Sequence, residues 1–94
     1  MIFSTVSKDK KIEILKIKLS TLEEDIFIKI LHINFDPDSF EPENFKSFFY
    51  SIKEEDKEKD LFLYNSYKQL DELLNFYIDL QNKIILLERE NNGI

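Results

Sequence analysis

Apolar residues repeat every three or four positions along the last third of the chain. Residues 61–90 contain no Gly or Pro, and a heptad frame that starts at Leu63 places apolar side chains at seven of eight a and d positions. These positions are Leu63, Ser66, Leu70, Leu73, Tyr77, Leu80, Ile84 and Leu87. A seam of this kind is typical of a helix that packs along its whole length on other helices. The pattern predicts a long coiled-coil-like helix over residues 58–91.

The segment 8–34 has two interpretations. As a helix it carries one apolar stripe that only Lys29 interrupts, and a capping box at Ser20 could break or restart it. This stripe consists of Ile12, Leu15, Leu19, Leu22, Ile26 and Ile33. As strands, the same apolar residues alternate with charged ones in a β-hairpin over residues 11–35. We favour the helix, because the turn of that hairpin would fall on residues 20–25, which contain no Gly, Asn or Pro.

The residue pattern in the middle of the chain predicts a loop followed by a short helix. Aspartates on both sides of Pro37 indicate a loop over residues 35–41. Pro42 suits a first helical turn, so we expect a short Phe-rich helix over residues 42–53. We therefore predict an all-α fold, a small helical bundle or helical hairpin, as a single domain over residues 1–94. The alternative is an α+β fold with the N-terminal β-hairpin.

The predicted long helix has more apolar residues than one seam needs. A helix with one solvent-exposed side requires an apolar stripe of roughly 100° around its axis. In the predicted long helix, apolar residues also occupy b, e and g positions of the heptad. We expect the second face to pack against another chain, most simply in a homodimer. The alternative is that the Phe-rich helix and the N-terminal residues cover it. The residues assigned to partner binding on this face are Tyr64, Tyr67, Leu74, Ile78 and Ile85.

Composition narrows the function classes. A chain that is 43% hydrophobic is too apolar to be disordered. With no cysteine and only His32, it has no thiolate or multi-histidine metal site, and no Gly-rich turn surrounds a serine. No apolar run reaches the roughly 18 residues of a membrane span, and the first residues lack a signal-peptide pattern. We expect a cytoplasmic, non-enzymatic protein with no catalytic residue, metal or cofactor and no membrane contact.

The net charge of −6 is unevenly distributed. Residues 1–20 carry +3 and residues 36–60 carry −5. An acidic chain is a poor candidate for direct nucleic-acid binding, because that affinity comes from neutralised phosphates. We expect instead a module that binds a protein with a basic or apolar surface, such as an inhibitor or adaptor from a phage or mobile element. Four acidic residues are assigned to this binding: Glu54, Glu55, Asp56 and Glu58. The alternative is an inhibitor whose carboxylates imitate nucleic acid.

The segment 66–77 resembles the signature helix of the small aspartyl-phosphate phosphatases that regulate sporulation, which are helical hairpins. The Leu-Asp-x-Leu-Leu part of that motif matches at residues 70–74. Tyr67 stands where the family has a serine, and Ser66 lies one residue earlier. The resemblance implies a functional role for Asp71, and a phosphatase of a signalling pathway as a second alternative function.

Overall fold

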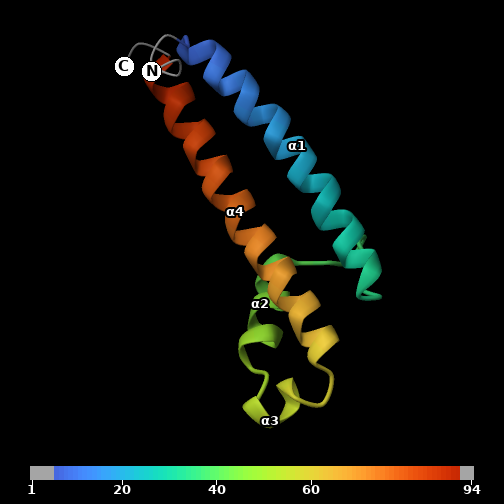
Figure 1. Ribbon diagram of the computed structural model, residues 1–94. Helices are drawn as coiled ribbons and strands as arrows, with labels where there is room; N and C mark the ends of the chain where they lie inside the picture. Colours follow the sequence, from blue (N-terminus) through green and yellow to red (C-terminus); the bar gives the residue numbers. More distant parts are fainter. Residues whose placement is uncertain (1–5, 92–94) are drawn as a thin grey trace.

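The computed structural model describes residues 6–91, of which 80% are helical and none is in a strand. In chain order the helices are α1 (Lys8–His32), α2 (Pro42–Tyr50), α3 (Glu54–Lys57) and α4 (Leu61–Asn91). Figure 1 shows α1 and α4 as an elongated antiparallel hairpin, with α2 beside the first half of α4 and α3 at the far tip. The all-α prediction is confirmed. The alternative β-hairpin over residues 11–35 is wrong, because α1 occupies those positions.

The first helix runs through Ser20 without a break. The Ser7 side chain caps its start by accepting a hydrogen bond from the Lys10 N–H at 3.2 Å. At the expected restart, the Thr21 hydroxyl donates to the Ile17 carbonyl within the helix at 3.2 Å. The apolar stripe is continuous across this point, so packing on α4 favours one helix over two.

A left-handed residue ends α1. Asn34 has φ 63°, a conformation that Asn tolerates better than most residues. The chain turns back there, and the Phe35 N–H donates to the Ile30 carbonyl at 3.1 Å while the Asn34 N–H donates to the Leu31 carbonyl at 3.1 Å. These two bonds form a Schellman motif, which satisfies carbonyls that the helix end leaves free.

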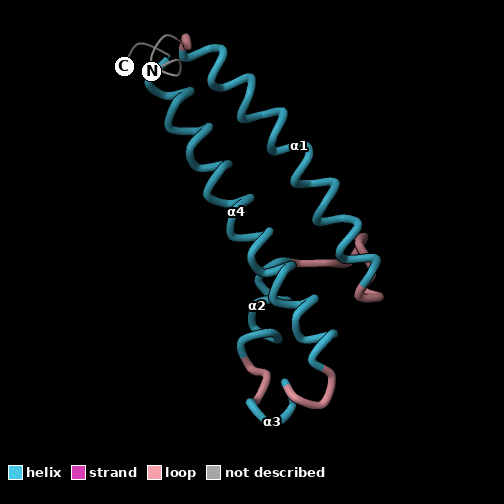
Figure 2. The backbone as a smooth tube through the Cα atoms, viewed as in Figure 1, coloured by secondary structure: helices cyan, strands magenta, loops and turns pink. Residues whose placement is uncertain are grey.

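The connection between α2 and α4 is longer than the sequence predicts. Figure 2 shows α2, the short α3 and the loops that join them to α4. The Phe-rich helix ends at Tyr50 rather than residue 53, and α4 begins at Leu61 rather than residue 58. Asp60 fixes this start, because its carboxylate accepts a hydrogen bond from the Leu63 N–H at 2.9 Å.

Every a and d position of α4 is buried or half-buried. Toward the α3 end, the core combines all three longer helices, and its buried members are Ile26, Ile30, Ile33, Phe45, Phe49, Leu70 and Leu74. Toward the other end, only α1 and α4 remain, and Ile12 and Ile84 are buried between them. Exposed ion pairs join the two helices at that end, with Lys16 3.1 Å from Glu88. The hairpin is therefore a three-helix structure over one half and a two-helix structure over the other.

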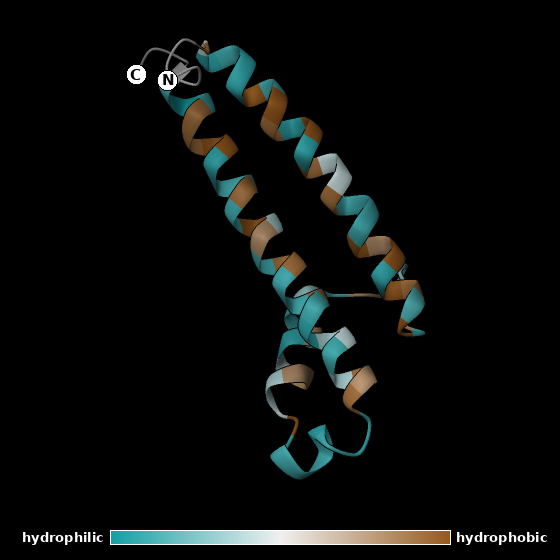
Figure 3. Ribbon diagram, viewed as in Figure 1, coloured by the Kyte–Doolittle hydropathy of each residue, from teal (hydrophilic) through white to brown (hydrophobic). Residues whose placement is uncertain are grey.

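Apolar residues occur along the whole of α1 and α4 (Figure 3). Among the residues that the structure describes, no helix is long and apolar enough to cross a membrane.

A substitution at Leu70 tests how much the packing of the a and d positions stabilises the fold. The Leu70 side chain is fully buried where α1, α2 and α4 meet. Replacing Leu70 by Ala should lower the free energy of unfolding by about 2–5 kcal/mol through lost transfer energy and a residual cavity. Leu86→Ala is the matched control, since Leu86 lies on the same helix and is 58% exposed. It should change stability by less than about 0.5 kcal/mol. Urea unfolding measures both, and equal losses would contradict this seam.

Candidate functional site

Three of the five residues assigned to the second face of α4 lie inside the protein. Leu74 is 4% exposed and belongs to the core. Tyr64 and Tyr67 are half-buried beneath α2 and the loop before it. The Tyr64 ring stacks on Phe49 with 5.6 Å between centroids, and the Tyr67 ring stacks on Phe35 at 5.9 Å. In this half, the Phe-rich helix covers Tyr64 and Tyr67, and Leu74 belongs to the core.

Ile78 and Ile85 are different, because they lie further along α4 than the tyrosines on which the rings of α2 pack. Ile78 is 40% exposed and Ile85 is 46% exposed. They continue the b positions of the same helix face on which α2 packs. The half of this face that no helix covers is therefore the part of the predicted partner surface that remains available.

An apolar groove lies between α1 and α4 at the point where α2 begins. Its cavity volume is about 400 Å³. The lining residues are Glu23, Ile26, Phe27, Ile30, Pro37, Phe40, Pro42, Leu74, Tyr77, Ile78 and Gln81. Phe27, which lines the groove, is 51% exposed. We call this feature the α1–α4 groove.

A short chain of hydrogen bonds crosses the α1–α4 groove. The Tyr77 hydroxyl donates to the Glu23 carboxylate at 2.9 Å, and the Gln81 amide donates to the Tyr77 oxygen at 3.3 Å. Burial raises the pKa of Tyr77 above its ordinary value, and the bond to Glu23 raises it further. Tyr77 therefore stays protonated at neutral pH and joins α4 to α1 as a hydrogen-bond donor.

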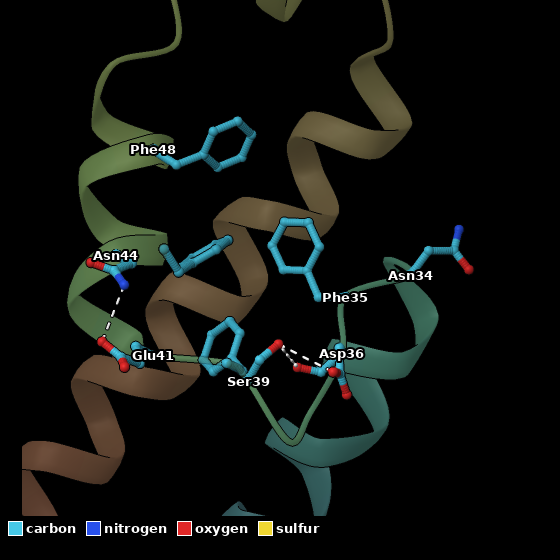
Figure 4. A pocket seen from close by; sticks show the side chains of 9 residues that line it. Asn34, Phe35, Asp36, Ser39, Glu41, Asn44 and Phe48 are labelled. Carbon is cyan, nitrogen blue, oxygen red and sulfur yellow. Dashed lines mark hydrogen bonds between the residues drawn. The ribbon is translucent and has the colours of Figure 1, made fainter.

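A second hollow lies beside the loop between α1 and α2 (Figure 4). It is lined by the rings of Phe35 and Phe48, among others, and has a volume of about 400 Å³. Four of its polar side chains have partners in the chain: Asp36, Ser39, Glu41 and Asn44. Asp36 accepts hydrogen bonds from the Asp38 N–H at 3.0 Å and from the Ser39 hydroxyl at 3.2 Å. These bonds close the turn of the loop.

Asp71 is the buried acid of this fold, with 7% of the residue exposed. Its carboxylate forms an ion pair with Lys46 of α2 at 2.6 Å and accepts hydrogen bonds from the Tyr50 hydroxyl at 3.1 and 3.2 Å. Asn75 donates to it from the next turn of α4 at 3.4 Å. The residue that the phosphatase resemblance singles out is thus held by α2, and its contacts attach α2 to α4.

The acidic residues assigned to partner binding lie at the α3 tip. Glu54, Glu55, Asp56 and Glu58 are all exposed there, at the end opposite the start of α1 (Figure 1). Lys57 contacts Glu54 at 2.7 Å, and this bond raises the pKa of Lys57. The structure therefore separates the acidic residues from the apolar ones. The acidic residues lie at the α3 tip, whereas Ile78 and Ile85 lie in the second half of α4.

Within residues 6–91, no three acidic or histidine side chains gather as a metal site would require. Comparisons of the chain with protein-family models, with curated proteins and with solved structures gave no match. The function is therefore inferred from the residues themselves.

Asp71→Ala tests whether the ion pair holds α2 in place. The change leaves Lys46 and Tyr50 without their shared acceptor, so stability should fall by about 1–3 kcal/mol. Glu72→Ala is the control, because Glu72 is the exposed neighbour of Asp71. In a double-mutant cycle with Lys46→Ala, urea unfolding should give a coupling energy of about 0.5–3 kcal/mol. Strict additivity would show that the pair contributes nothing to the docking of α2.

The acidic tip should add little to stability. Replacing Glu54, Glu55, Asp56 and Glu58 by Gln removes exposed charges whose ion pairs are screened by water. The melting temperature, followed by circular dichroism, should stay nearly unchanged. A fall of more than about 4 °C would correspond to roughly 1 kcal/mol in a domain of this size. That result would mean that the tip contributes to the fold.

Proposed function

We propose that the protein is a non-enzymatic protein-interaction module that binds an amphipathic helix of a partner protein in the α1–α4 groove. One observation supports this most directly. Along one half of the α1–α4 pair, α2 packs beside the two helices. Along the other half no helix from residues 6–91 takes that place, and Phe27, Ile78 and Ile85 are exposed. A helix from another protein could complete the three-helix packing there.

The lengths of the helices explain why α2 covers only half of this face of α4. At about 1.5 Å per residue, α2 is about 14 Å long and α4 about 46 Å long. Once α2 has packed on the first turns of α4, the rest of the same face has no helix from residues 6–91 to cover it. Helix-in-groove binding uses a surface of this shape.

The rim of the groove indicates the chemistry of the partner. Glu23 lines the groove and is exposed. Exposed carboxylates beside an apolar floor favour a helix with one apolar stripe and Lys or Arg on its flank. The acidic α3 tip would add to the rate of encounter with such a basic partner. Occupying a surface of a host protein in this way would suit an inhibitor or adaptor of a phage or mobile element.

Site-specific photocrosslinking in host cells tests the proposal. A benzophenone amino acid at Ile85, within the exposed part of the face, should yield one discrete protein adduct. The same probe at Lys83, an exposed residue of the same helix that points away from this face, should not. Adding Ile78→Asp should remove the adduct, because it places a charge on the apolar floor.

Two outcomes would contradict the proposal. Equal adducts from Ile85 and Lys83 would show that contact is not confined to the face of α4 that carries Ile78 and Ile85. An adduct that survives Ile78→Asp but is lost when Glu54, Glu55, Asp56 and Glu58 become Gln would favour a nucleic-acid mimic that acts through its tip. The quadruple variant also serves as a control for overall charge.

A further inference from the structure

A second apolar stripe follows α1 on the side that faces away from α4. Its members are Ile14, Ile17, Thr21, Glu24, Ile28 and Leu31, and we call them the outer stripe. They are spaced three and four residues apart in alternation, which is the spacing of a coiled-coil seam. The four apolar members are between 49% and 63% exposed. The seam of α1 that packs on α4 therefore has an unpartnered counterpart on the opposite face.

The outer stripe is complementary to itself when it is read in the opposite direction. A twofold axis between Thr21 and Glu24 would place Ile14 against Leu31 of a second copy and Ile17 against its Ile28. In the centre, each Thr21 would meet Glu24 of the other copy, so the two Glu24 carboxylates do not face each other. A parallel pairing would instead bring the two Glu24 carboxylates together, which costs free energy in a seam that excludes water.

Charges beside the stripe have the same symmetry. Lys18 and Asp25 lie on one flank of the outer stripe, one heptad apart and both exposed. Neither side chain has an ion pair or hydrogen bond within the part of the chain that the structure describes. In the antiparallel pairing, Lys18 of each copy would face Asp25 of the other, which gives two ion pairs across the twofold axis.

We propose that the outer stripe of α1 docks against the outer stripe of a second copy of this chain, antiparallel, to form a homodimer. Such an interface is isologous, with the same surface patch used by both copies. It differs from the dimer face that the sequence predicts on α4. The homodimer interface does not include the α1–α4 groove, which stays accessible to another partner. The homodimer therefore does not depend on the proposed function.

Sedimentation equilibrium with charge-swapped variants tests both the occupant and the orientation. The wild-type protein should be dimeric at about 100 µM. Lys18→Glu alone and Asp25→Lys alone should each weaken dimerisation by about tenfold or more, because each change creates two like-charge contacts. The double variant Lys18→Glu/Asp25→Lys should regain the wild-type affinity, since the swapped charges pair again. An equimolar mixture of the two single variants should form a heterodimer.

Ile17→Glu/Ile28→Glu should give a monomer with unchanged helix content by circular dichroism, because both side chains are exposed in the single chain. A wild-type monomer at about 100 µM would overturn the proposal. So would a dimer that survives Ile17→Glu/Ile28→Glu, or a double charge swap that fails to restore affinity. If the monomer instead binds anionic lipid vesicles through these isoleucines, the stripe faces a membrane surface and not a second copy.

Discussion

The packing of α1 on α4 is the contact on which the rest of the molecule depends. Both helices present one apolar seam, and Leu70 is fully buried where these seams meet α2. Neither α2 nor α3 is long enough to be stable as an isolated helix in water. They hold their places because the hairpin supplies a surface for the rings of Phe45 and Phe49. Without the seam there would be no core for them to complete.

A pair of helices can bury only the faces that point toward each other. Apolar residues elsewhere on α1 and α4 must be covered by another element or remain in water. α2 solves this problem for the first half of α4 with its aromatic side chains, and the Asp71–Lys46 ion pair fixes its position. Beyond that half the chain has no further helix among residues 6–91. The exposed Ile78, Ile85 and Phe27 follow from helix length alone.

Periodicity predicted which residues form the seam but not which element would cover each face. All eight a and d positions of α4 are buried or half-buried, as the heptad frame predicts. Asp71, at a b position, is singled out only by the phosphatase resemblance, and no local pattern predicts its burial or its ion pair with Lys46, 25 positions earlier. Tyr64, Tyr67 and Leu74 are the residues that the sequence assigns to a partner, and in the structure they pack within the chain. This packing depends on tertiary geometry that no local pattern contains.

The outer stripe and the α1–α4 groove occupy different faces of the same hairpin, so both could be used at once. A homodimer built on the outer stripe would carry two copies of the groove, related by the twofold axis. If the partner is itself dimeric or presents repeated helices, the second binding event becomes intramolecular, and its effective concentration can raise the overall affinity by about 10²–10⁴-fold. The two grooves of the homodimer would then bind such a partner tightly, although each groove is small. A small exposed groove is adequate under this arrangement, because symmetry supplies the second contact.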